Sequence, residues 1–321
     1  MKWRESPSPE SAGLSTSAIQ KYADWLHTTA GSAPYGTLIV HKGLIAHEAY
    51  GSGGSEDSKW EIGSIRKSVT STLLAMAIEE SRFTLDTPAY DIWPDIFTLT
   101  NQEKDKQIQM RHLATNTSGW MTDFGPNEQW LYNNAACTAG GVVLGRLYNL
   151  PDDKIAPLIY KRIAQPIGAD GWDCYHYDET FTPSSHGNPG PKLAIDATLR
   201  DLAKYGYLWQ QKGRLQEQIL ISEPYLSEAI SNRTAHLKGH YGYWWFTNDH
   251  QILLPDAPAD TFYHVGNGRN NRRTVLLIIP SLDLIAIVGT SALAYDINAN
   301  YKAHPVPEVN DWIACILNAC I

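Results

Sequence analysis

The stretch Gly63-Ser64-Ile65-Arg66-Lys67-Ser68-Val69 begins a helical pattern that continues to Glu80. Its apolar residues recur at helical spacing, and its polar residues are mostly serine and threonine, which predicts a buried helix. Residues three apart are neighbours on a helix, so we expect the Ser64 hydroxyl and the Lys67 amine to share one side of it.

This pair of residues suits nucleophilic catalysis. A serine at a helix start lies near backbone N–H groups and the positive end of the helix dipole, where an oxyanion can develop. A lysine removed from water loses its proton more readily and can then act as the base for the serine. One Ser-x-x-Lys arises by chance in a chain of about this length. Taken alone, the motif is equally compatible with an exposed lysine on a surface helix.

Tyr132-Asn133-Asn134 is a second candidate motif, placed where a helix is expected to begin. Tyr132 has a phenol that can relay protons, and Asn134 has a carboxamide that can hold Lys67 or a substrate amide. The alternative is a packed tyrosine beside an Asn134 that caps the helix.

A third candidate is His264-Val265-Gly266-Asn267-Gly268, which lies between two strand-like runs. Glycine lets a backbone approach a ligand closely, so the Asn267 amide is a candidate partner of the Ser64 amide in an oxyanion hole. His240-Tyr241-Gly242 is a competing His-x-Gly triplet.

Strand patterns occur near both ends of the chain. Lys42-Gly43 predicts a hairpin between two of them. The predicted strands cover residues 35–41, 44–50, 241–247, 261–265, 273–279 and 284–289. The predicted helices cover residues 15–28, 64–80, 110–115, 134–148, 157–163, 193–210 and 309–320. We therefore expect an α/β (α+β) fold, in which a central antiparallel sheet with flanking helices is formed by residues 1–84 and 184–321, and residues 85–183 form an inserted all-helical lobe.

The composition excludes several classes of function. The net charge is −8 and the basic residues are dispersed, which argues against nucleic acid as a partner. No apolar run is long enough for a bilayer, and the first seven residues lack a signal pattern, so we expect a cytoplasmic protein without a membrane partner. Eleven Trp and seventeen Tyr fit either a large core or an aromatic-lined pocket.

No metal or cofactor is expected from the motifs. The cysteines show no Cys-x-x-Cys spacing, so we interpret Cys137, Cys174, Cys315 and Cys320 as packing thiols. Residues 174–178 hold possible ligands, but we interpret them as a surface or pocket-rim loop. Gly266-Asn267-Gly268 lacks the rest of a dinucleotide fingerprint.

The order of the three motifs resembles that of the serine β-lactamase and penicillin-binding superfamily. Within it, the chain is similar to the class C β-lactamase-related esterases and amidases, of the 6-aminohexanoate-dimer hydrolase kind. Segments typical of that group occur through most of the chain, at residues 60–63, 110–113, 117–119, 200–206 and 241–245.

The resemblance implies a β-lactamase-like sandwich with a helical lobe and a site between the two. It implies that Ser64 is the nucleophile, Lys67 its base, Tyr132 a second acid/base and Asn134 a positioning residue. The match at residues 241–245 precedes the third motif and thereby favours His264 over His240.

The chain departs from the family pattern in three places. His264-Val265-Gly266 stands where β-lactamases of this type carry Lys-Thr-Gly, and residues 269–272 replace a glycine-rich continuation. Asn116 stands where relatives commonly have histidine, a change that we interpret as structural. The first two departures bear on the substrate, because those residues face the leaving-group and carboxylate ends of a ligand.

Four functions are compatible with these motifs. The favoured one is hydrolysis of a small ester or amide through an acyl-enzyme. A transacylase or amide synthase that passes the acyl group to a biosynthetic acceptor comes second. A β-lactamase or D-peptidase and a non-catalytic binding protein complete the set. The presence of Ser64, Lys67, Tyr132 and Asn134 together argues against the last.

Overall fold

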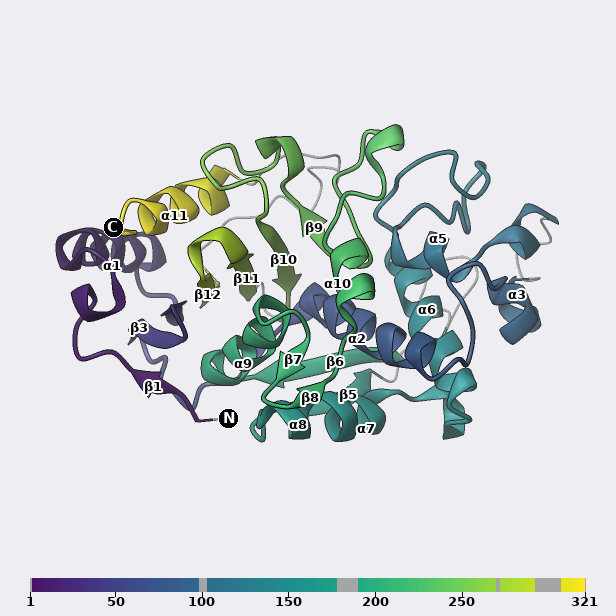
Figure 1. Ribbon diagram of the computed structural model, residues 1–321, viewed down its shortest axis with the longest axis horizontal. Helices are drawn as coiled ribbons and strands as arrows, with labels where there is room; N and C mark the ends of the chain where they lie inside the picture. The colour runs from purple at the N-terminus through teal and green to yellow at the C-terminus, as the bar shows by residue number, and fades with distance from the viewer. Residues whose placement is uncertain (1, 98–102, 178–189, 270–271, 292–306, 321) are drawn as a thin grey trace.

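A seven-stranded sheet forms the centre of the molecule (Figure 1). The computed structural model describes residues 2–97, 103–177, 190–269, 272–291 and 307–320. In spatial order the strands are β1 (Arg4–Glu5), β3 (Leu44–Gly51), β2 (Tyr35–His41), β12 (Leu284–Thr290), β11 (Arg273–Ile279), β10 (Phe262–Asn267) and β9 (Phe246–Thr247). Every neighbouring pair is antiparallel except β1 and β3. The sheet expected from both ends of the chain is confirmed, with one parallel pair at its edge.

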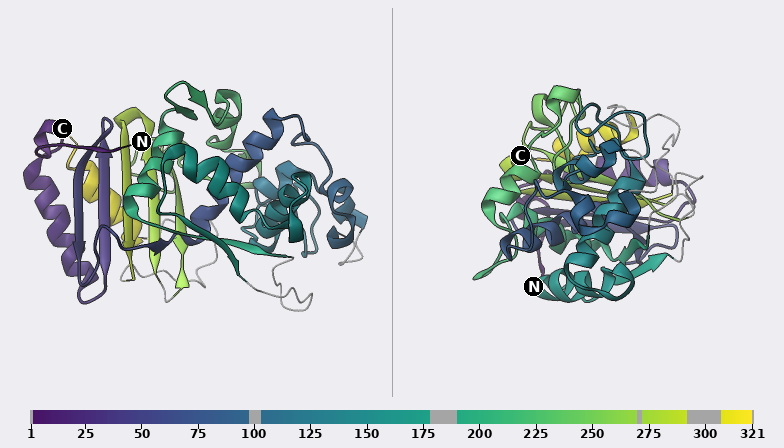
Figure 2. Two further views of the ribbon diagram at one scale, coloured as in Figure 1. Left: turned by 90° about the horizontal axis from the view of Figure 1, so that it is seen from below. Right: turned by 90° about the vertical axis from the view of Figure 1, so that its right-hand side faces the viewer.

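Helices cover both faces of this sheet, as the edge-on view in Figure 2 shows. On one face, α1 (Thr16–Ala30) packs beside α11 (Pro307–Leu317) over a hydrophobic core of its own. On the other face lie α9 (Leu199–Gln210) and α2 (Arg66–Glu79), whose core continues into the helical part of the molecule. The strands alternate their side chains between the two cores, which fixes the register of the sheet.

Local sequence signals explain two of these elements. Ser15 caps α1 by accepting a hydrogen bond from the backbone N–H of Ala18. The turn between β2 and β3 places Lys42 at φ 51° and Gly43 at φ 73°, a left-handed pair that matches the twist of a hairpin. Both the helix and the hairpin were expected.

Helix α2 is buried from its first residue, Arg66, through Ala77. Its polar side chains are satisfied inside the protein, because Ser68 donates to the carbonyl of Trp244 and Ser71 bonds the phenol of Tyr225. The prediction of a buried helix rich in serine and threonine is therefore confirmed.

Seven further helices lie between α2 and β9 in the described part of the chain, in addition to α9. They are α3 (Ala89–Ile92), α4 (Pro94–Phe97), α5 (Met110–Ala114), α6 (Asn134–Leu147), α7 (Ala156–Ile159), α8 (Gln165–Ile167) and α10 (Glu223–Ala229), with a π-helical turn at Tyr160–Ala164 between α7 and α8. No helix in the described ranges has both the length and the apolar character needed to cross a bilayer.

A second sheet corrects the expectations for two segments of the sequence. Its strands are β4 (Trp60–Glu61), β6 (Lys192–Ala197) and β5 (Asp173–Tyr177). The segment 85–183 is therefore not all-helical, and residues 174–177 form a strand instead of a loop, while Asp178 and the proposed boundary at 183/184 lie outside the described residues. The single helix expected over 193–210 is wrong, because Thr198 takes an extended conformation and caps α9, which separates β6 from that helix.

A third correction concerns residues 241–247, which were expected to form one strand. Only β9 is a strand there, because Trp244 takes a left-handed φ of 58° that interrupts an extended run. A minor two-stranded ribbon, β7 (Arg214–Leu215) with β8 (Gln218–Ile219), lies elsewhere. Most of the tryptophans fill the core: Trp120, Trp209, Trp244, Trp245 and Trp312 are fully buried.

Candidate active site

Ser64 lies in a tight turn that leads directly into α2. Residues Gly63–Ile65 form a single 3-10 turn, and the backbone N–H of Arg66 continues its hydrogen bonding to the carbonyls of Gly63 and Ser64. Ser64 is partly exposed, whereas both of its neighbours in the chain are buried. The helix therefore presents this one hydroxyl to solvent at its amino end.

Lys67 completes the pair that the sequence predicted. Its Nζ lies 2.6 Å from the Oγ of Ser64 and is hydrogen-bonded to it. The residue is only 2% exposed. Burial holds the pKa of the Lys67 amine well below its usual range, and the neighbouring cation of Arg66 lowers it further. A neutral amine beside a hydroxyl is the arrangement that a general base requires.

Tyr132 closes the site from the side of α6. The Nζ of Lys67 lies 4.7 Å from the centre of the Tyr132 ring. That ring stacks on Phe246 at 5.9 Å, with an angle of 8° between the planes, and meets Tyr241 edge-on at 6.1 Å. Some of the aromatic side chains therefore line the site, although most of them fill the core.

His264 lies on β10, next to Tyr132 and Tyr241. Its side chain is fully buried, its Nε2 lies 3.5 Å from the Tyr241 hydroxyl, and its ring centre is 6.4 Å from that of Tyr132. Burial holds the pKa of His264 well below its usual range, and Lys67, when protonated, lowers it further. His264 therefore stands beside the site as a neutral imidazole.

The end of β10 packs against the turn that carries Ser64. Gly63 takes a left-handed φ of 49°, and a Cβ at this position would lie 2.6 Å from the carbonyl oxygen of Asn267. A Cβ on Gly266 would lie 2.7 Å from the carbonyl carbon of Ile62. Glycine at both positions lets the two backbones touch, which brings the Asn267 backbone beside the Ser64 turn.

Comparisons with known proteins identify the family of the chain. The family model described as beta-lactamase matches residues 31–306. The chain belongs to the beta-lactamase family.

Solved structures of low sequence identity share the fold. A candidate beta-lactamase from Bacteroides dorei has a TM-score of 0.69 at 15% identity, over 94% of this chain and 98% of its own. A candidate 6-aminohexanoate-dimer hydrolase from Bacillus anthracis has a TM-score of 0.67 at 16% identity, over 92% and 80% of the two chains. A D-stereospecific amidohydrolase from Streptomyces has a TM-score of 0.65 at 16% identity, over 86% and 94%. The expected β-lactamase-like fold is thereby confirmed.

In this beta-lactamase family member, Asn134 differs from Lys67, Tyr132 and His264 in being exposed. It is the first residue of α6 and is exposed, and Asn133, not Asn134, caps that helix by accepting from the N–H of Ala136. The structure describes no hydrogen bond between Asn134 and Lys67. Of the two tasks suggested for Asn134, contact with a substrate amide fits its exposure better, and this role stays a prediction.

A network that sequence reasoning missed holds the third motif in place. The backbone N–H of Arg269 donates to Glu61 Oε2 at 2.7 Å, and its Nε donates to the same oxygen at 3.0 Å. Its Nη2 donates to the Tyr175 hydroxyl at 2.6 Å and reaches Asp196 at 3.4 Å. These contacts bind the loop after β10 to β4, β5 and β6. No local sequence pattern predicts these contacts, because the partners are 73 to 208 residues apart in the sequence.

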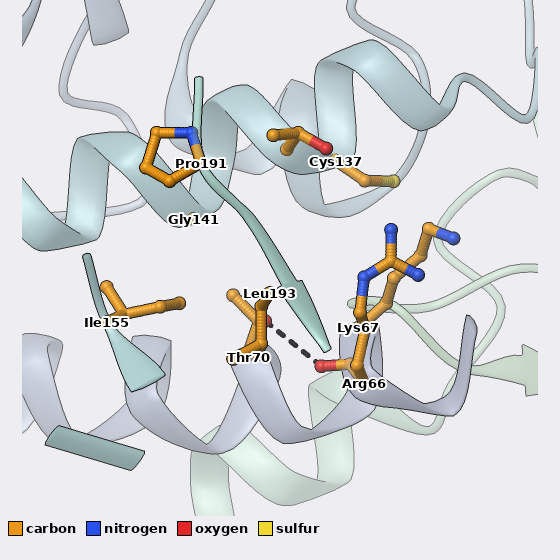
Figure 3. Close-up of a pocket in the computed structure, with 9 residues that line it drawn as sticks. Arg66, Lys67, Thr70, Cys137, Gly141, Ile155, Pro191 and Leu193 are labelled. Carbon is orange, nitrogen blue, oxygen red and sulfur yellow. Dashed lines mark hydrogen bonds between the residues drawn. The ribbon is translucent and has the colours of Figure 1, made fainter. Parts of the chain in front are cut away.

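A small recess opens beside Lys67 between α2, α6 and β6 (Figure 3). Arg66 and Lys67 both project from α2 toward α6, where Cys137 lies. The guanidinium of Arg66 donates to the carbonyl of Gly63 at 3.2 Å, so its charge is held next to the Ser64 turn. The His/Cys/Asp/Glu side chains of the described residues form no group of three or more that could hold a metal ion.

Proposed function

We propose that this protein is a serine hydrolase that cleaves a small ester or amide through an acyl-enzyme on Ser64. The observation that carries the proposal is the 2.6 Å contact between the Ser64 hydroxyl and the buried amine of Lys67. An amine whose pKa is lowered by burial can take the serine proton near neutral pH.

In the acylation step, Ser64 Oγ attacks the carbonyl carbon of the substrate while its proton passes to Lys67. We expect the backbone amides of Ser64 and Asn267 to hold the oxyanion that forms, and the close approach of Gly63 to the Asn267 backbone supports this role. Tyr132, whose ring lies against Lys67, passes the proton to the leaving alcohol or amine as the carbonyl carbon releases it.

In the deacylation step, water attacks the acyl carbon and loses a proton to the same basic groups. The acid is released and the Ser64 hydroxyl is restored, so the cycle balances without a cofactor. A nucleophilic amine or alcohol that replaced water would give acyl transfer by the same path, which is the second function considered for these motifs.

We also propose that the preferred substrates carry no carboxylate near the reacting bond. His264 is neutral where relatives have lysine, and the side chain of Val265 offers no hydrogen bond. Arg269 is engaged by Glu61, Tyr175 and Asp196. One structural neighbour is a D-stereospecific amidohydrolase, which supports an amide as a substrate class.

The test is covalent labelling of the nucleophile. A fluorophosphonate should add one adduct to the native protein, and peptide mapping should place it on Ser64. Ser64→Ala should abolish both the adduct and ester hydrolysis, with a loss of several orders of magnitude in kcat. Ser68→Ala is the matched control, because Ser68 lies on the same helix but donates into the core to Trp244. Near-full esterase activity in purified Ser64→Ala would overturn the proposal.

A further inference from the structure

Asn116 holds the backbone on both sides of Tyr132. Its carbonyl accepts a hydrogen bond from the N–H of Leu131 at 3.0 Å. Its side-chain Oδ1 accepts one from the N–H of Asn133, also at 3.0 Å. The backbone N–H groups of the residues on either side of Tyr132 are therefore bound by one residue located 16 positions before Tyr132 in the sequence.

The conformation of Asn116 is specialised for this contact. It is 1% exposed and takes a left-handed φ of 59°, which asparagine and histidine adopt more readily than most residues. The same Oδ1 also accepts from the thiol of Cys137 at 3.4 Å, which connects Asn116 to the first turn of α6. One side-chain oxygen thus links the loop before Thr117, the Tyr132 backbone and the helix that follows.

Tyr132 depends on this connection because its own segment is not part of a helix or strand. It lies just before α6, and the preceding Leu131 is 41% exposed. The ring is packed by Phe246 and Tyr241. The hydrogen bonds that Leu131 and Asn133 donate to Asn116 hold the backbone on either side of that ring.

We propose that Asn116 is a positioning residue for Tyr132, acting through the backbone of residues 131–133. The inference rests on the proposed function, in which Tyr132 transfers the proton. It also gives a physical meaning to the residue type, because a histidine in the same left-handed conformation presents a ring nitrogen that can accept the Asn133 N–H. Because Asn116 acts on the placement of the phenol, we expect its loss to affect the chemical step more than binding of the ester.

The experiment compares Asn116→Gly with Asn116→His by steady-state kinetics on a neutral p-nitrophenyl ester. Glycine accepts the left-handed backbone without strain but removes the side-chain oxygen that accepts from the Asn133 N–H. Asn116→Gly should lower kcat by about 10- to 100-fold with KM little changed, since a misplacement of about 1 Å can cost 10²-fold. Asn116→His should recover most of the native kcat. Asn149→Gly is the matched control, because Asn149 is exposed, follows α6 and has a left-handed φ of 52°.

Thermal unfolding of every variant separates positioning from folding. Each assay is run well below the unfolding midpoint of the variant tested. A kcat for Asn116→Gly equal to that of the native protein overturns the inference. So does a loss shared equally by Asn149→Gly. If Asn116→Gly does not fold, Asn116→His decides alone: a folded variant with a kcat ten or more times below native overturns the proposal.

A Tyr132→Phe background distinguishes a failure of this inference from a failure of the proposed hydrolase function. If Asn116 acts through Tyr132, adding Asn116→Gly to Tyr132→Phe should cost much less than it costs in the native protein. An equal cost in both backgrounds contradicts the positioning role while leaving the hydrolase intact. If Tyr132→Phe itself keeps native activity, the proposed role of Tyr132 fails first, and the inference fails with it.

Discussion

A Cβ atom on Gly63 would lie 2.6 Å from both the carbonyl carbon and the carbonyl oxygen of Asn267. Real side chains do not tolerate such a distance, so the two backbones touch with no space for any residue but glycine. Gly63 directly precedes Ser64, and Asn267 ends β10. This contact joins the helix that carries the serine to the strand that carries the third motif.

Gly63→Ala should therefore reduce catalysis more than it reduces stability. The new methyl group must push the Asn267 backbone away from Ser64, and loss of one oxyanion donor costs about 10²- to 10³-fold in kcat. Acylation is measured as the pre-steady-state burst with a p-nitrophenyl ester, and stability by thermal unfolding.

Gly31→Ala serves as the control for Gly63→Ala. Gly31 has a left-handed φ of 56°, similar to that of Gly63, and no atom lies within 4 Å of a Cβ placed there. This variant experiences the backbone strain without the clash. Equal losses of burst rate in the two variants would show that strain, and not displacement of Asn267, explains the effect.

The sequence allowed the sheet and the central pair to be predicted, because both follow from short-range patterns. The hairpin at Lys42-Gly43 and the Ser64–Lys67 contact depend on residues that are adjacent or one helical turn apart. Their geometry is set by local backbone preferences, which a sequence expresses directly.

The remaining features depend on distant residues that no local pattern connects. The short run at β6 has the period of neither a clear helix nor a clear strand, and its strand form depends on pairing with β4 and β5. The bonds of Arg269 to Glu61 and of Asn116 to Asn133 join separate parts of the chain. Asn116 was noticed only as a departure from relatives, and its partner could not be inferred without the fold.

Lys67 and Tyr132 should behave as one proton-transfer unit. The Lys67 Nζ lies over the Tyr132 ring at 4.7 Å, so the removal of either group disturbs the same step. Lys67→Met and Tyr132→Phe should each lower kcat/KM by ~10²-fold or more. The double variant should lose far less than the product of the two factors. A double-mutant cycle measures this coupling, and strictly multiplicative losses would show that the two residues act separately.

The pH profile should report the neutral state of Lys67. Burial lowers the pKa of that amine first, and the charge of Arg66 lowers it further because two neighbouring cations repel. Activity requires the unprotonated amine, so kcat/KM should fall as the pH drops through the pKa of Lys67 in the folded protein.

Arg66→Met removes one of the causes that lower the pKa of Lys67 and should therefore raise that pKa. The acid limb of the kcat/KM profile should move to higher pH, so that activity is lost more at low pH than at high pH. Arg66→Lys keeps a positive charge near the same place and should leave the limb closer to that of the native protein. An acid limb that stays fixed in Arg66→Met, in a folded variant, would mean that Arg66 does not tune Lys67.

The protein should hydrolyse neutral esters far better than β-lactams. A β-lactam such as nitrocefin carries a carboxylate beside the reacting amide, and burying that group without a charged or hydrogen-bonding partner costs several kcal/mol, or about a thousand-fold in affinity. His264 is buried and neutral, and Arg269 is bound to Glu61. The kcat/KM for a p-nitrophenyl ester of a short acid should therefore exceed that for nitrocefin measured on the same preparation.

The methyl ester of nitrocefin separates the effect of the carboxylate charge from the effect of the lactam ring. It has the same lactam and the same leaving chemistry but lacks the carboxylate, so it should acylate Ser64 faster than nitrocefin does. Arg272 is exposed and lies over the ring of Trp60 at 5.8 Å, which makes it the cation to examine if nitrocefin is turned over. In that case Arg272→Gln should abolish the preference for the charged lactam. Turnover of nitrocefin at about 10⁶ M⁻¹s⁻¹, in the upper part of the usual enzyme range, with little hydrolysis of the simple ester, would replace the ester or amide proposal with a β-lactamase.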